Sequence, residues 1–497
     1  MQVFGLECMC AVYGAGWCVA MRGTLGIPCG GLLARVRPAA LSPWRTILLF
    51  AKHPPVWRRH GLCTAGFHTV SLSPAAPSPA SPAMADDAAH RMTGAERRAS
   101  ASLAAIFALR MLGLFLVLPV FALEAARLPG GDDAARVGLA MGMYGLTQAF
   151  LQIPFGLASD RFGRKPTIVA GLLLFAVGSG IAAWAPDLTW LTIGRAVQGA
   201  GAISAAVTAF LADVTRDGVR TKAMAMVGAS IALMFALSLV LAPLLAAAIG
   251  LAGIFALTGA LALAGIAVVV WVAPPEPVVH KPSDMRQLRS GLGEALRHAG
   301  LLRLNLGVFV LHAVQLAMWM AVPALLVQAG LAKVDHWQVY LPAVVASLLV
   351  MGGVLFPLER RGKLRGVFLA AIGLIALVQL GLWWVASRSG AEGAAPGLWT
   401  LGLLMFAFFI GFNTLEASQP SLASRLAPAH ARGAALGVYN TLQSVGFFVG
   451  GAVGGWLASA HGATGLFAVC GAAMLVWLVL AWPMQVPPPK AGISARS

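Results

Sequence analysis

The chain has 497 residues, of which 59% are hydrophobic and only 11% charged, and its mean hydropathy is +0.81. Soluble domains carry roughly 25% charged residues, so a soluble fold is excluded and lipid must be part of the solvent. Only helices and closed barrels satisfy every backbone group in hydrocarbon. The apolar runs here lack the alternation of barrel strands, which favours helices.

The formal net charge is +17, which in a soluble protein would suggest nucleic acid as a partner. Here the Lys and Arg residues lie in short breaks between apolar runs, where they set the orientation of a membrane protein. We therefore expect the lipid bilayer as a partner and no nucleic acid.

Residues 1–98 differ from the rest, because they are basic and contain the stretch SLSPAAPSPASPAM at 71–84. Such a sequence buries too little apolar surface to fold. We expect a disordered N-terminal extension. A start codon assigned too far upstream, with Met84 or Met92 as the true beginning, would account for it equally well.

From Leu103 onward, apolar runs of about twenty residues, each long enough to cross a 30 Å hydrocarbon core, alternate with short polar breaks. We predict twelve membrane helices in two bundles of six, 99–272 and 303–484, with a cytoplasmic linker at 273–302 and a short tail at 485–497. The predicted spans are 102–126, 137–159, 166–185, 190–212, 221–248, 251–272, 303–328, 338–357, 366–387, 398–424, 433–459 and 463–484.

The distribution of basic residues predicts the orientation. The loops after even-numbered spans hold 17 Lys and Arg residues, and the loops after odd-numbered spans hold 4. Because basic loops stay in the cytoplasm, both termini are expected there, in a multi-pass inner membrane protein. The sequence Asp-Arg-Phe-Gly-Arg at 160–164 is echoed by Glu-Arg-Arg-Gly-Lys at 359–363, so the two bundles look like internal repeats around a central site.

The most specific segment joins the second and third spans and reads GLASDRFGRKP, residues 156–166. A tight turn between two membrane helices needs a glycine, and cations are favoured at helix carboxyl ends. An acid at the membrane edge needs a cation or a helix amino end as its partner. The residues concerned are Gly156, Asp160, Arg161, Gly163, Arg164 and Lys165, with Asp213 as a second acid on the same side.

This segment resembles the signature loop of the major facilitator superfamily, and the similarity extends over residues 103–484. RAVQGAG at 195–201 resembles that family's helix 4 motif. LRMLG at 109–113 and FNTLEA at 412–417 resemble the YajR-type drug:proton antiporters. YajR-type proteins often carry a further cytoplasmic domain after helix 12, which we do not expect in the 13 residues after the last span. The resemblance implies that the loop is a latch between the halves, with Asp160 facing Arg432 and Gly433 at the start of helix 11.

Ionisable groups inside a membrane are costly and usually functional. The candidates for proton coupling or the cavity are Arg110, Arg195, His312 and Glu416. Glu416 is the first of these, because a carboxylate can exchange a proton as its surroundings alternate between wet and dry. The alternative is that it merely pairs with an arginine. Uncharged polar candidates for the cavity wall are Gln148, Gln152, Gln198, Gln315, Asn413 and Asn440.

These features predict a secondary transporter working by alternating access, with proton-coupled efflux of small lipophilic or drug-like compounds as the first hypothesis. A facilitator or symporter importing a sugar, organic acid or amino acid is the alternative. A polytopic enzyme or sensor is a third class, which the sequence disfavours because it lacks a metal-binding HExxH run and a phosphate-binding loop. We expect a monomer that uses no cofactor, no metal and no ATP.

Overall fold

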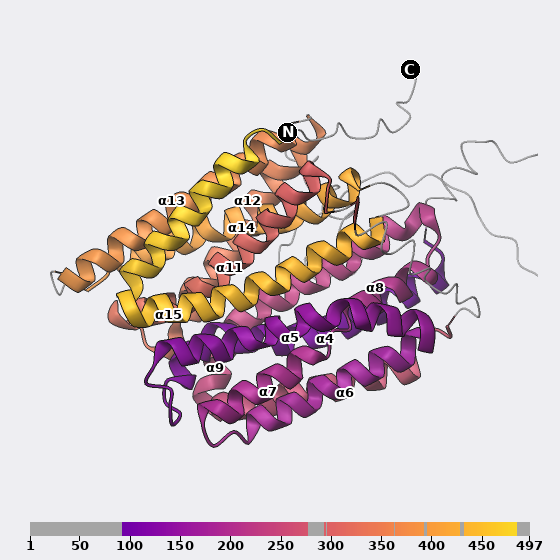
Figure 1. The fold of residues 1–497 in the computed structure, drawn as a ribbon, viewed down its shortest axis with the longest axis horizontal. Coiled ribbons are helices and arrows are strands. Elements are labelled where there is room, and N and C mark those ends of the chain that lie inside the picture. Colours follow the sequence, from indigo (N-terminus) through magenta and orange to yellow (C-terminus); the bar gives the residue numbers. More distant parts are fainter. Residues whose placement is uncertain are drawn as a thin grey trace, which may run out of the picture. The chain divides into compact units, whose positions relative to one another are not determined.

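The structure is a computed structural model that describes residues 92–276, 293–294, 296–361, 363–391, 395–427 and 432–484. The predicted extension up to residue 91, most of the linker and the tail from residue 485 lie outside these ranges. Within them the fold is α-helical (Figure 1). The helices are α4 (Gly94–Ala125), α5 (Ala134–Phe162), α6 (Arg164–Ala183), α7 (Leu188–Ala200), α8 (Ser204–Asp213), α9 (Asp217–Ala267), α11 (Ala299–Gln328), α12 (Trp337–Arg360), α13 (Leu364–Ala391), α14 (Leu398–Leu426) and α15 (Arg432–Ala481), with short turns η1 (Val268–Val272) and η2 (Lys333–Asp335).

The long helix α9 contains two membrane crossings. Ser230 donates a hydrogen bond to the Ala104 carbonyl (3.3 Å), and Thr258 donates one to the Gly113 carbonyl (3.1 Å). In a straight helix Ser230 and Thr258 would lie about 42 Å apart, whereas their partners on α4 are separated by only about 14 Å. The chain therefore reverses between them, at Gly250, whose φ of +66° is one that glycine adopts without strain.

Helix α15 reverses in the same way. A Cβ on Gly446 would lie 2.5 Å from the Phe309 carbonyl oxygen, and one on Gly307 would lie 2.7 Å from the Trp477 ring. Positions 446 and 477 therefore both contact the same turn of α11, although a straight helix would separate them by about 46 Å. The reversal falls at Gly462, with φ +65°.

In the described part of the chain, nine helices are long and apolar enough to cross a membrane. Two of the nine are the reversing helices, which count once each, and the 29-residue α5 is not among the nine. Counting both arms of α9 and α15, adding α5 and taking α7 with α8 as one crossing, the helices match the twelve predicted spans in number and order. The fourth crossing, which consists of α7 and α8 and which we call helix 4, is interrupted at residues 201–203.

Helix α4 begins earlier than predicted. Thr93 and Glu96 form a reciprocal capping box, in which each side chain accepts from the other residue's backbone N–H. Glu96 also accepts hydrogen bonds from Arg216 at 2.7 and 3.0 Å. The extension expected to reach residue 98 is therefore helical from Gly94. Helix α11 likewise starts before the predicted span at 303, at Ala299, where His298 caps it.

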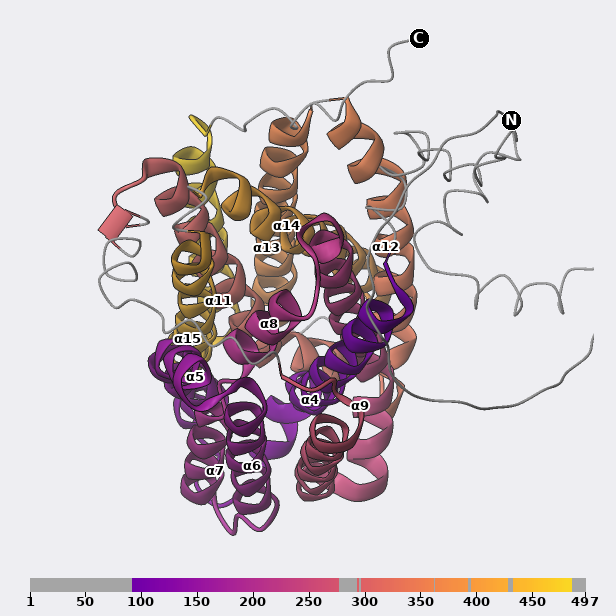
Figure 2. The ribbon, with the colours of Figure 1, turned by 90° about the vertical axis from the view of Figure 1, so that its right-hand side faces the viewer.

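The two bundles, α4–α9 and α11–α15, meet where α5 lies beside the first arm of α15, as both ribbon views show (Figures 1 and 2). Small residues allow this approach: a Cβ on Gly138 would lie 2.2 Å from the Gly451 carbonyl oxygen, and one on Gly142 would lie 2.6 Å from that of Phe448. We call this contact the seam; it consists of Gly138, Gly142, Gly145, Gly451 and Gly455.

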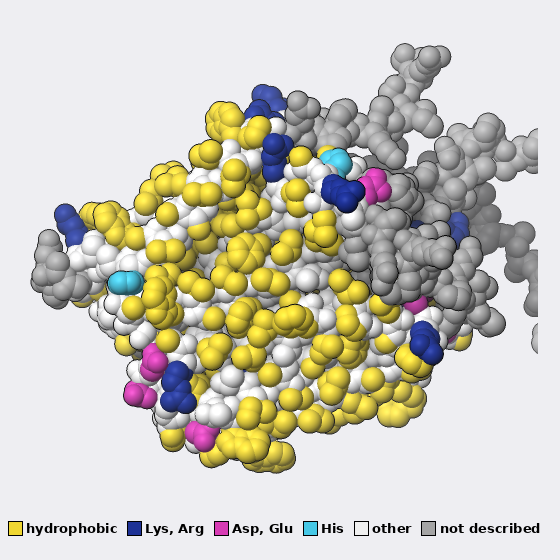
Figure 3. All heavy atoms as spheres, viewed as in Figure 1, with side chains coloured by type: hydrophobic (Ala, Val, Ile, Leu, Met, Phe, Trp, Pro, Cys, Tyr) yellow, Lys and Arg dark blue, Asp and Glu magenta, His cyan; other side chains and the backbone are white. Residues whose placement is uncertain are grey.

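The surface has the pattern that a bilayer requires. In Figure 3 the Lys, Arg, Asp and Glu side chains gather toward the ends of the visible face, with an apolar band between them. Exposed side chains on the helices include Leu377 at 65%, Val479 at 71% and Phe150 at 73%. Water would disfavour so much exposed apolar area, whereas lipid tails accommodate it.

Candidate functional site

The signature loop, residues 156–166, is held together around Arg164. Its guanidinium donates to Ser159 (2.8 Å), to Asp160 and to Asp213 (2.8 Å). Asp213 is the last residue of α8. The loop between α5 and α6 is therefore bound to the end of α8. Asp213, predicted as a second acid for the loop arginines, contacts Arg164 among them.

A residue outside the predicted set completes this cluster. The Glu276 carboxylate accepts hydrogen bonds from the backbone N–H groups of Arg164 (3.0 Å) and Lys165 (2.5 Å), the first residues of α6. A carboxylate is favoured at a helix amino end, where backbone donors lack intrahelical partners. Lys165 returns the contact by donating to the Ala273 carbonyl (2.9 Å). The loop is therefore bound to the first residues of the inter-bundle linker.

Two glycines and one arginine of the loop have separate environments. Gly163 has φ +104°, and a Cβ there would lie 2.9 Å from Glu276, so only glycine fits this turn. Gly156 faces Ala205 of α8, 3.6 Å from where its Cβ would be. Arg161 is exposed and lies over the Phe162 ring, 5.4 Å from its centre.

Asp160, which we expected to face the start of the eleventh crossing, binds Arg164 within its own bundle. Nothing lies within 4 Å of where a Cβ on Gly433 would be, and the Arg432 side chain lies outside the described part of the chain. The same space surrounds Gly437, one turn further along α15. The bundles touch at the seam, and these two glycines of α15 make no such close contact. We call the end of the bundles that carries the signature loop the basic end.

Arg110 is 1% exposed and fills the interruption in helix 4. It donates to the Gly201 carbonyl (3.2 Å), which ends α7, and to Ser204 (3.2 Å), which begins α8. It also donates to the Tyr144 hydroxyl (2.7 Å) and to Gln148 (3.4 Å). The helix carboxyl end offers partial negative charge to this cation, in place of a carboxylate.

Arg195 is also 1% exposed and lies on the other side of Tyr144. Its guanidinium is 4.9 Å from the centre of the Tyr144 ring and donates to Gln198 at 2.5 Å. Gln198 in turn donates to Ser179 of α6 (2.9 Å). Neither buried arginine has an acid among its described partners. Hydrogen bonds, ring faces and a helix end stabilise these charges.

The acid of the second bundle lies beside a histidine. Glu416 Oε2 is 3.3 Å from His312 Nε2, so Glu416 pairs with His312 rather than with the arginine considered from the sequence. His312 Nδ1 lies 2.8 Å from the Val308 carbonyl oxygen, and Nε2 lies 2.8 Å from the Gln443 amide nitrogen. The three side chains come from α14, α11 and α15.

These contacts leave one position for a proton. A carbonyl oxygen only accepts, so His312 Nδ1 carries hydrogen, and Nε2 accepts from the Gln443 amide. Glu416 Oε2, shielded from solvent, then has no described donor and faces a second acceptor. A proton on Glu416 Oε2, directed at His312 Nε2, satisfies both atoms, whereas a proton on Nε2 would face the Gln443 amide donor. The Glu416 side chain is 40% exposed, although it lies about 15 Å from the end of α14.

Aromatic rings surround this pair. Phe447 and Phe412 meet the His312 ring edge to face at 4.9 and 6.0 Å. Phe412 is also 6.3 Å from Phe235 of the first bundle, which in turn meets Phe115 at 5.1 Å. The acid therefore lies next to an aromatic group to which both bundles contribute.

The remaining polar candidates are dispersed. Asn413 donates to Ser347 of α12 (2.9 Å), and Asn440 is half-buried. Gln152 and Gln315 are 2% and 3% exposed, and their carbonyl oxygens have no described partner. The structure thus gathers the candidates into two groups: one joins Arg110, Arg195, Gln148 and Gln198 through Tyr144, and the other joins Glu416 and His312 through Gln443.

Comparison with known proteins agrees with this fold. The family model described as Major Facilitator Superfamily matches residues 103–450 and 358–497. The inner membrane transport protein YajR of Escherichia coli K12 is 41% identical over 80% of this chain and 86% of its own length. The multidrug resistance protein MdtH of Aeromonas salmonicida is 27% identical over 74% of this chain and 88% of its own length.

Solved structures show the same fold at low identity. The nucleoside transporter NupG matches with a TM-score of 0.62 and 13% identity, over 77% of this chain and 99% of its own. The human organic anion transporter MFSD10 matches with a TM-score of 0.57 and 18% identity, over 78% of this chain and all of its own.

The chain therefore belongs to the major facilitator superfamily, as the signature loop predicted. It is a multi-pass inner membrane transporter and not an enzyme.

Proposed function

We propose that this transporter exports small lipophilic, drug-like compounds in exchange for protons, with Glu416 and His312 as the coupling pair. The observation that carries the proposal is the 3.3 Å contact between two groups that need one proton between them. A bound proton satisfies the pair, and its loss leaves a carboxylate facing the His312 lone pair. Deprotonation therefore favours a rearrangement around Glu416.

The surroundings of the pair suit lipophilic cargo. Phe412, Phe447 and Phe235 offer ring faces and edges, whereas Glu416 is the only acid that contacts His312 in the described part of the chain. Pockets for apolar ligands combine such walls with a few polar groups. Efflux is further supported by the names of the relatives, an inner membrane transport protein and a multidrug resistance protein.

The distribution of charge supports an orientation with the basic end in the cytoplasm. The bundles are joined at the opposite end, where Lys333 meets Glu124 (3.3 Å) and Ser459 donates to Asp133 (3.0 Å). Under this orientation the structure corresponds to a state open to the cytoplasm. The signature loop would then contact the start of α15 only in the outward-open state.

Proteoliposomes with an imposed pH gradient test this function. In liposomes that contain the wild type, a fluorescent lipophilic dye should move in the direction opposite to the flow of protons down their gradient. A protonophore should abolish this movement. Glu416→Gln should reduce gradient-driven flux to that of protein-free liposomes. Asp132→Asn, which removes an exposed acid at the other end, is the matched control and should retain it.

Two results would contradict the proposal. Flux that ignores the gradient in the wild type would indicate facilitation, the alternative from the sequence. Gradient-driven flux that persists in Glu416→Gln would show that protons are coupled elsewhere.

A further inference from the structure

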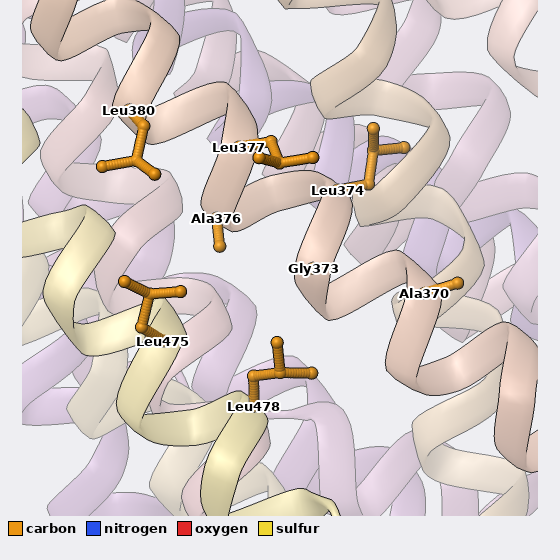
Figure 4. Close-up of a pocket in the computed structure, with 8 residues that line it drawn as sticks. All are labelled: Ala370, Gly373, Leu374, Ala376, Leu377, Leu380, Leu475 and Leu478. Atoms are coloured by element: carbon orange, nitrogen blue, oxygen red, sulfur yellow. The ribbon is translucent and has the colours of Figure 1, made fainter.

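A groove on the outer surface of the second bundle is separate from the central pair. It lies between α13 and the second arm of α15 and has a volume of about 410 Å³. Every lining residue is alanine, glycine or leucine, and Figure 4 shows the leucines of the two helices on either side of Gly373 and Ala376. The leucines are Leu374, Leu377, Leu380, Leu475 and Leu478.

The groove is formed because Gly373, which has no side chain, lies among leucines of α13 and α15. A Cβ on Gly373 would lie 3.9 Å from Leu478, so the helices do not close at this point. Leu377 and Leu475 are 65% and 43% exposed. Both helices are long and apolar enough to cross the membrane, so the groove opens to the hydrocarbon and not to water.

One end of the groove is basic. α13 and α15 run antiparallel, and Arg365 at the start of α13 donates to the Met484 carbonyl (2.9 Å) and to that of Trp482 (2.5 Å) at the end of α15. Arg361 and Lys363, in the turn before α13, are exposed. Trp482 is 63% exposed, as aromatic residues at the headgroup level commonly are.

The depth of the groove matches one leaflet of the bilayer. Ala370 lies about 7 Å along α13 from Arg365, and Leu380 lies about 22 Å from it. The hydrocarbon of one leaflet is about 15 Å thick. A lipid whose headgroup lies at Arg365 would therefore extend its tail along this groove.

We propose that the groove binds an acyl chain of an anionic phospholipid whose headgroup contacts Arg361, Lys363 and Arg365. The apolar lining accounts for the tail, and the positive charge at its end selects the negative headgroup. Each basic residue close to an anionic membrane surface contributes about fivefold in affinity, so Arg361 and Lys363 together should contribute roughly 30-fold.

Native mass spectrometry of the full chain in detergent tests the site, with phosphatidylglycerol and phosphatidylcholine of identical chains titrated separately. The wild type should bind phosphatidylglycerol more tightly. The double variant Arg361→Gln with Lys363→Gln should lose this preference and keep its affinity for phosphatidylcholine. Gly373→Leu, which fills the groove, should weaken binding of both lipids. Ala370→Leu fills the same groove at another position and should have the same effect.

Matched controls separate the site from general effects. Arg97→Gln with Arg98→Gln removes two exposed charges at the start of α4, and Gly402→Leu adds the same side chain on α14 where nothing lies within 4 Å. Both controls should behave as the wild type. Equal binding of the two lipids by the wild type would overturn the proposal, as would equal losses in controls and test variants. A dimer that dissociates on Gly373→Leu would also overturn it and assign the groove to a second copy.

Discussion

The seam between α5 and α15 provides the sharpest test of how the bundles move. Gly138→Ala adds one methyl group at a point where its carbon would lie 2.2 Å from the Gly451 carbonyl oxygen and 2.6 Å from the Gly455 Cα. Both neighbours are backbone atoms of a helix, so no side-chain rotation can relieve the clash. The helices must separate by about 1 Å to restore ordinary contact, in a region packed as tightly as a crystal.

The size of the effect follows from the cost of overpacking. Extra methylenes in a packed site cost about 1–3 kcal/mol, and every 1.4 kcal/mol changes an equilibrium tenfold. This cost applies only to the state in which the seam is closed. The substitution should therefore shift the population toward the state with a parted seam by a factor of roughly 5 to 150.

Pulsed electron spin resonance between labels on the two bundles measures this shift. Asp132→Cys and His461→Cys place labels at exposed positions beside the seam, in a background without other cysteines and in lipid nanodiscs. Gly138→Ala should add or enlarge a long-distance population relative to the wild type. Gly437→Ala is the matched control, because it makes the same change on α15 where nothing lies within 4 Å.

A clear outcome would refute this reasoning. In that outcome Gly138→Ala folds and gives the same distance distribution as the wild type and the control. The close contact at the seam then does not limit how the bundles part at the end opposite the signature loop. Gly142→Ala, with a Cβ 2.6 Å from the Phe448 carbonyl oxygen, should reproduce any genuine shift.

Four further substitutions have defined outcomes. Asp160→Asn should slow transport while leaving insertion intact, and normal flux through correctly inserted protein would show that the latch is dispensable. Glu276→Gln removes the charge that caps α6 and should cost about 0.3–1 kcal/mol, measured as faster amide exchange at Arg164; unchanged exchange would contradict this role. Arg110→Lys loses the planar fork that reaches Tyr144 and the helix 4 break and should lower stability by about 1–3 kcal/mol, visible as a lower melting temperature. Thr93→Ala removes the capping box and should cost about 1 kcal/mol, with faster exchange confined to the first turn of α4; a global change would contradict a local cap.

Much of the fold could be predicted because membrane helices are specified locally. Runs of twenty apolar residues must satisfy their backbone groups internally, so spans such as 398–424 and 433–459 follow from hydropathy alone. Glycine marked the reversals as well: the predicted breaks at 249–250 and 460–462 contain Gly250 and Gly462, which adopt positive φ. The start of α4 was missed because Thr93 and Glu96 extend the helix beyond the apolar run.

The candidate site was predicted only in part. Hydropathy located Arg110, Arg195, His312 and Glu416, since charge inside a membrane span stands out. It could not show that Arg110 and Arg195 share Tyr144, because that residue is uncharged and 34 positions from Arg110. Glu276 was missed because it lies beyond the last apolar span, and its target, the amino end of α6, is 112 residues away. One signal could have indicated Glu276. It is an acid that closely follows the sixth span, on the side of the membrane where the third span begins.

The sequence by itself determined the solvent, the number and order of the crossings and the family, because each depends on residues that are close along the chain. Only the tertiary structure decided which groups meet: Glu416 with His312 rather than with an arginine, Asp160 with Arg164, and the glycines of the seam with backbone atoms of the opposite bundle. Those pairings depend on how helices cross and on which end of the bundles is closed. Such packing is set by side-chain shape over distances that no local pattern records.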